Sequence, residues 1–178
     1  ALGIIIIIIE NKKDIKVNDL FSYSENIYLD QGFKFPNDKL KLDISNFLKD
    51  RFKYYLKEKN IRHDIIESAT KILNLNKIST AYEKAQSLNK VINKSIGEDI
   101  VSSYKRAFNI LNSEIKNKDE KLSNTTDPGI FKNDFEKALF SKTNELKQYF
   151  SVITKKQNFD ETLIYLASAK KEVFDFFD

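Results

Sequence analysis

The chain has 178 residues, of which 41% are hydrophobic and 31% are charged. This length allows one domain with a real core, and the composition is that of a folded chain. The longest apolar run, residues 4–9, is much shorter than the roughly 20 residues of a membrane-spanning helix, so no membrane contact is predicted. The absence of Cys excludes disulfides, thiolate metal sites and cysteine nucleophiles, and it favours a cytoplasmic location.

The net charge of +4 and the pI near 9.0 favour an anionic partner, although the abundance of Lys, Ile and Asn is also typical of a genomic bias. The four glycines are far apart, so neither a phosphate loop nor a dinucleotide fingerprint occurs. His63 is the only histidine, and His63-Asp64 therefore lacks the further ligands that a metal site needs. We predict no catalytic residue and no metal ligand.

In chain order, residues 1–10 fit either a helix or a core strand, because six consecutive isoleucines have no usable period. Helical spacing follows in residues 17–28, and again from Asn37 or Asp38 to Leu56. Asp64 and Glu67 resemble a capping box that opens a third helix, and Ser79 and Ser95 are predicted to begin the next two.

Residues 116–127 are polar and predict a loop. Asp127-Pro128 predicts the start of a helix, and Asn158 with Glu161 predicts the start of the last one. Nothing after residue 10 requires a strand. We therefore predict an all-α fold, a single helical bundle of about seven helices, in which residues 1–14 end a preceding helical region and residues 15–178 form the domain.

The segment around residues 103–111 has two faces. One arc, at ~100° per residue, is apolar and is predicted to be buried; it contains Ile96, Ile100, Tyr104, Ala107, Phe108, Leu111 and Ile115. The opposite arc carries Lys105, Asn109, Asn112 and Lys116, with Arg106 on its flank. Cations mixed with amides suit contacts with phosphates and base edges, but the same residues are also typical of a solvated face.

Arg51 falls within the apolar stripe of the second predicted helix, which contains Leu40, Ile44, Phe47, Leu48, Phe52, Tyr55 and Leu56. A guanidinium on a core face needs an acidic partner or a solvated cleft, because an unpaired buried charge is costly. Two interpretations are open: a structural ion pair, or a cation that lines a groove for phosphate.

Several short segments have the same order and spacing as in one known family; they lie at residues 1–5, 50–52, 55–56, 64–66, 105–111, 166–167 and 176–178. The most specific are Lys-Arg-x-x-Asn-Ile-Leu at 105–111 and Phe-Phe-Asp at 176–178. Together they resemble the C-terminal region of the β subunit of bacterial heterotetrameric glycyl-tRNA synthetase. Ile6 stands where this family usually has arginine, and the Asp-Ala-Leu-Arg tetrapeptide of the related domain type does not occur.

The resemblance implies a helical anticodon-binding domain of the type named for Asp-Ala-Leu-Arg, whose C-terminal end is expected to lie beyond Asp178. It implies glycine tRNA and the α subunit of the heterotetramer as partners. It also implies that ATP and Mg²⁺ are used at the α subunit and that this segment needs no cofactor.

On this interpretation Lys105, Arg106 and Lys116 would contact the RNA backbone, as would Arg51, while Asn109 and Asn112 would read bases. Tyr54, Tyr55 or Tyr104 would stack a base. Two alternatives remain: a helical assembly module that contacts other parts of the synthetase and no RNA, and the related anticodon domain of arginyl-tRNA synthetase.

Overall fold

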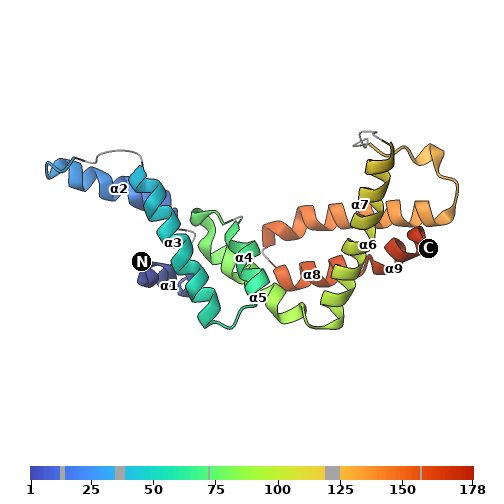
Figure 1. The fold of residues 1–178 in the computed structure, drawn as a ribbon, viewed down its shortest axis with the longest axis horizontal. Helices are drawn as coiled ribbons and strands as arrows, with labels where there is room; N and C mark the ends of the chain where they lie inside the picture. The colour runs from blue at the N-terminus through green and yellow to red at the C-terminus, as the bar shows by residue number, and fades with distance from the viewer. Residues whose placement is uncertain (13–14, 35–38, 72, 119–124, 157) are drawn as a thin grey trace. The chain divides into compact units, whose positions relative to one another are not determined.

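The computed structural model describes residues 1–12, 15–34, 39–71, 73–118, 125–156 and 158–178 (Figure 1). Within these ranges every regular element is a helix and none is a strand, which confirms the predicted all-α class. The α-helices are α1 (Leu2–Glu10), α2 (Val17–Asp30), α3 (Lys39–Glu58), α4 (His63–Lys71), α5 (Ile78–Val91), α6 (Ser95–Lys118), α7 (Asp134–Lys156), α8 (Phe159–Ala167) and α9 (Lys170–Phe177), and the 3₁₀ helices are η1 (Leu75–Lys77) and η2 (Pro128–Ile130). No helix in the described part of the chain is long and apolar enough to cross a membrane.

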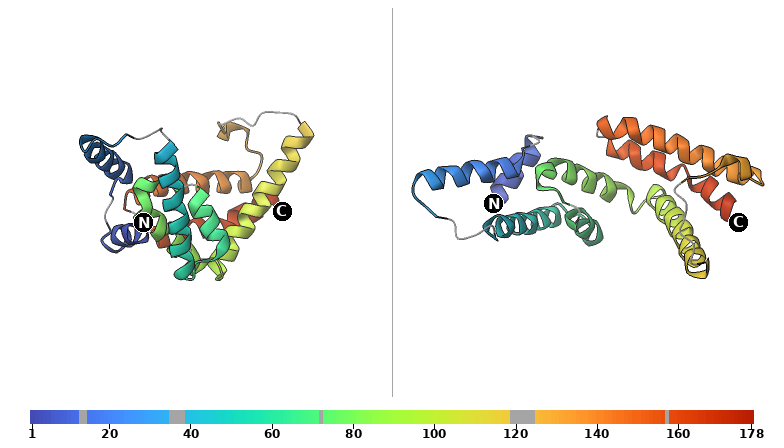
Figure 2. Two further views of the ribbon diagram at one scale, coloured as in Figure 1. Left: turned by 60° about the vertical axis from the view of Figure 1, so that its left-hand side comes forward. Right: turned by 90° about the horizontal axis from the view of Figure 1, so that it is seen from above.

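The helices gather into two compact units, residues 1–89 and residues 90–178, which we call unit 1 and unit 2. In unit 1, α3 contacts both α1 and α4. In unit 2, α6 and α7 each contact α8 and α9, and Figure 2 shows α7 running beside the α8–α9 segment. The domain boundary expected at residue 14 stays a prediction.

The isoleucine run forms helix α1. Ile5, Ile8 and Ile9 are buried, whereas Ile4 and Ile7 are 45% and 57% exposed. The buried positions have the i, i+3, i+4 spacing of one helical face, and α1 contacts α3. Packing against α3 therefore decides between helix and strand, a choice that β-branched residues alone leave open.

Helix α3 supplies the centre of unit 1. Leu48, Phe52 and Leu56 are at most 3% exposed, so the C-terminal half of the predicted apolar stripe is buried as expected. The N-terminal half of the stripe is not buried, because Leu40 and Phe47 are 40% and 47% exposed. The predicted start of this helix at Asn37 or Asp38 lies outside the described residues.

The predicted capping box of α4 is wrong. The Asp64 carboxylate pairs with Arg62, at 2.6 Å between Nη2 and Oδ2, and the same guanidinium lowers the pKa of that carboxyl group. Glu67 instead accepts hydrogen bonds from Lys53 of α3 at 3.0 and 3.2 Å. A local partner for Asp64 and a partner from α3 for Glu67 thus replace the predicted capping pattern.

The predicted loop at 116–127 and helix start at Asp127-Pro128 also need correction. Helix α6 continues to Lys118, and Asp127 accepts a hydrogen bond from the Gly129 amide, at 2.8 Å, in a single 3₁₀ turn. Helix α7 begins later, where Asn133 accepts from the Glu136 amide at 2.9 Å. Asp127 thus caps only the short η2, and Asn133 caps the long helix that was expected to begin at Asp127.

The predicted cap of the last segment is confirmed, because Asn158 accepts from the Glu161 amide at 3.2 Å and begins α8. Helices α7 and α8 are joined by the rings of Tyr149 and Tyr165, which stack with centroids 3.7 Å apart. The Tyr165 hydroxyl donates to the Glu145 carboxylate. A stacked aromatic pair thus contributes to the α7–α8 contact.

We expect unit 2 to lose stability at alkaline pH through Tyr149. Burial, with the nearby Glu161 carboxylate, raises the pKa of its phenol to about 12. Since an unfolded tyrosine has a pKa of about 10, the unfolded chain releases this proton first and stability falls as the pH rises above about 10. Melting temperatures measured from pH 9 upward check this: Tyr149→Phe should reduce the alkaline loss, and the exposed Tyr23→Phe should leave it unchanged.

Candidate nucleic-acid interface

Helix α6 holds α9 through polar contacts. Asp99 of α6 pairs with Lys170 of α9 at 2.7 Å, and within α6 the Ser103 hydroxyl donates to the Asp99 carbonyl, also at 2.7 Å. One turn further, Arg106 Nη2 donates to the Phe177 carbonyl at 3.1 Å. The side of α6 that faces α9 therefore contains Asp99 and Arg106.

Arg106, one of the predicted RNA-binding residues, is partly buried. Its guanidinium pairs with the Asp178 carboxylate and lies 5.0 Å from the centroid of the Phe174 ring. Its side chain is 30% exposed, and its Nε is buried with no hydrogen-bond partner among the described residues. The guanidinium thus ties the end of α9 to α6, and a direct contact with RNA stays a prediction.

The apolar arc of α6 is not buried as predicted. Tyr104 is 63% exposed, Phe108 48%, Leu111 43% and Ile115 41%; we call these four residues the α6 ridge. The ion pairs to α9 rotate the helix so that Asp99 and Arg106 face inward. Periodicity located the two faces in the sequence but did not decide which of them packs, because polar residues, Asp99 and Arg106, make the contacts with α9.

The outer surface of α6 combines aromatic, cationic and amide groups. The rings of Tyr104 and Phe108 stack at 5.4 Å with an interplanar angle of 22°. Lys105 and Asn109 beside them are exposed, and Lys105 forms no ion pair within the described ranges; Asn112 is half-buried. The predicted Lys116 lies outside the residues whose side chains are described. The sequence already contained the signal for this stacked pair in the i, i+4 spacing of its two aromatics.

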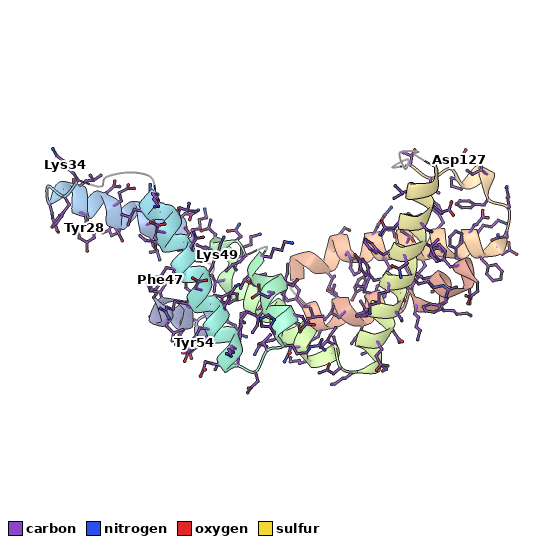
Figure 3. All side chains as sticks on the ribbon, in the orientation of Figure 1. Tyr28, Lys34, Phe47, Lys49, Tyr54 and Asp127 are labelled. Carbon is purple, nitrogen blue, oxygen red and sulfur yellow. The ribbon has the colours of Figure 1, made fainter. Side chains whose placement is uncertain are left out.

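Arg51 lies in unit 1 and is exposed, which corrects its expected place on a core face. Its guanidinium carbon sits 4.9 Å from the centroid of the Phe47 ring. Phe47 and Tyr54 are 47% and 48% exposed, and Figure 3 shows both on the side of α3 away from Lys49. Contact with the Phe47 ring replaces the structural ion pair, one of the two interpretations, and the phosphate contact stays a prediction.

The contacts of Arg106 with Phe177 and Asp178 were missed at the sequence level. More than seventy residues separate the partners, and no periodic pattern links positions so far apart. Lys105, Asn109 and Asn112 share one helix of unit 2, whereas Arg51 belongs to unit 1.

Comparison with known proteins gives one consistent result. The chain is 34% identical over 179 residues to a protein of Rickettsia canadensis (strain McKiel) named glycine--tRNA ligase beta subunit, a match that covers 99% of this chain and 25% of that protein. It is 30% identical to the protein of the same name from Rickettsia prowazekii (strain Madrid E), covering 100% of this chain and 24% of the relative. No family model matches. The chain spans about a quarter of the length of these relatives and is similar, along its whole length, to part of a glycine--tRNA ligase beta subunit.

Proposed function

We propose that this chain is the tRNA-binding, anticodon-recognising part of a glycine--tRNA ligase beta subunit. The observation that carries the proposal is the exposed, stacked pair of Tyr104 and Phe108, with the exposed Lys105 and Asn109 beside it. The names of the relatives favour glycine tRNA over arginine tRNA.

The chemistry of this surface suits a single-stranded loop. Unstacked bases in such loops pack on aromatic side chains, and their edges bond to polar groups. An Asn side chain offers both an acceptor for the exocyclic amine of cytosine and a donor for its ring acceptors. Asn109 and Asn112 therefore recognise bases in this proposal, Lys105 contacts a phosphate, and Tyr104 with Phe108 stacks a base.

The proposal assigns no catalytic step to this chain. Aminoacylation with ATP and Mg²⁺ belongs to the α subunit, in a heterotetrameric enzyme of the cytoplasm, and this segment contributes affinity and selectivity for the tRNA. Arg51 is a further candidate for backbone contact, since its guanidinium is exposed and stacks on an exposed ring.

The second candidate function is assembly with another part of the ligase. Tyr104, Phe108, Leu111 and Ile115 have the 4-3-4 spacing of a helix-packing seam, and all four are exposed. A ridge with this spacing also suits a second amphipathic helix.

One binding experiment separates the two functions. In the full-length ligase, Tyr104→Ala should weaken glycine-tRNA binding at fixed salt by roughly 5- to 150-fold, the loss of one stacked base. Tyr23→Ala, which removes a similarly exposed tyrosine from unit 1, is the matched control and should not alter it. Unchanged tRNA affinity in a folded Tyr104→Ala protein would contradict the proposal, and loss of subunit assembly with intact tRNA binding would favour the assembly function.

A further inference from the structure

A polar groove of about 680 Å³ lies between α3 and α4 in unit 1. Lys49, Lys53 and Asn46 come from α3, and Ser68 and Lys71 from α4. All the residues that line it are polar or charged. Figure 3 shows Lys49 on the side of α3 that faces α4. Two helices thus present cations and neutral donors to one open surface.

Two of the three lysines in the groove have no carboxylate partner among the described residues. Lys53 binds both oxygens of Glu67, at 3.0 and 3.2 Å, and this contact lowers the pKa of that carboxyl group. The pair spans the groove from α3 to α4 and is neutral as a whole. Lys49 and Lys71 form no ion pair with any described residue, and Asp50 is the remaining carboxylate. The groove therefore has an excess of positive charge.

Helix α3, which forms one side of the groove, also has a positive net charge. Helix α3 contains six basic residues (Lys and Arg) and three acidic ones (Asp and Glu). Unit 1 as a whole contains fifteen basic and twelve acidic residues. The positive excess of unit 1 is thus equal to that of α3 alone. A helix with this charge attracts a polyanion at long range, and the groove offers short-range partners for its phosphate oxygens.

We propose that the α3–α4 groove binds the phosphodiester backbone of RNA, as a second contact surface separate in sequence from the α6 ridge. This inference rests on the proposed tRNA-binding function. Lys49 and Lys71 neutralise phosphates, while Asn46 and Ser68 donate hydrogen bonds to phosphate oxygens, as neutral side chains commonly do at nucleic-acid backbones. Asp50 limits the affinity through repulsion.

The test is the salt dependence of glycine-tRNA binding by the full-length ligase. Each phosphate contact contributes about 0.7 to 0.9 to the slope of log K against log salt. The double variant Lys49→Gln with Lys71→Gln should therefore lower the slope by about 1.4 to 1.8. Lys57→Gln, on the same helix but outside the groove, is the matched control and should leave the slope unchanged. Asp50→Asn should tighten binding.

Each outcome has one meaning. A lower slope in the double variant, kept at the original value by Lys49→Arg with Lys71→Arg, supports the groove. An unchanged slope in the double variant, together with a lower slope for Lys105→Gln, would overturn the groove and leave the proposed function standing. Weakened subunit assembly with intact tRNA binding would also overturn it, in favour of an acidic protein partner. Absence of tRNA binding by the unaltered enzyme would overturn both proposals.

Discussion

Phe52→Ala is expected to lower the free energy of unfolding of unit 1 by roughly 3–5 kcal/mol. Phe52 is 0% exposed in the middle of α3, which contacts both α1 and α4. Removing its ring takes away the buried apolar surface and leaves a cavity that the flanking helices fill only in part. An effect of this size is comparable with the whole stability of many small domains.

Denaturant unfolding of the variant measures this loss, and amide hydrogen exchange should locate it in α1, α3 and α4. Phe47→Ala is the matched control, since the same side chain is removed from the same helix at a position that is 47% exposed. Its cost should be well below that of Phe52→Ala. Equal losses for the two variants would contradict the packing of α3 described above.

Arg106→Ala is expected to destabilise unit 2 by roughly 1.5–3 kcal/mol, the range for hydrogen bonds that involve charged groups. The substitution removes the donor to the Phe177 carbonyl, the partner of Asp178 and the cation beside the Phe174 ring. Lys105→Ala, at the adjacent exposed position, should change stability little. A double-mutant cycle between Arg106 and Asp178 measures the coupling directly, and additive losses would argue against the ion pair.

The same two variants test the proposed RNA contact, because a structural cation and a cation that contacts RNA should change the salt dependence of binding differently. Lys105→Ala should lower the salt slope of tRNA binding by about 0.7 to 0.9, as expected for one phosphate contact. If the Arg106 guanidinium acts only through the position of α9 relative to α6, Arg106→Ala should weaken binding with the slope unchanged. A lower slope for Arg106→Ala would show that its charge does reach the RNA.

The predictions that succeeded depended on local chemistry. Asn158 and Glu161 cap α8 as expected, because the partners lie three residues apart. The capping box of Asp64 failed because Arg62 and the distant Lys53 provided charged partners for its two carboxylates. Asp127 caps a helix with proline in its first turn, as expected, but that helix is the short η2, and Asn133 caps the longer α7.

The sequence by itself determined the all-α class, the position of most helices and the polar face of α6 at Lys105 and Asn109. These follow from the 3.6-residue period and from short-range caps, which each segment carries within itself. Only the tertiary structure decided that the isoleucine run is helical, that Arg106 turns toward α9 and that Tyr104 and Phe108 remain exposed. The physical reason is that burial and ion pairing depend on partners far along the chain, such as Asp178 for Arg106, and a helical period specifies a face without specifying what covers it.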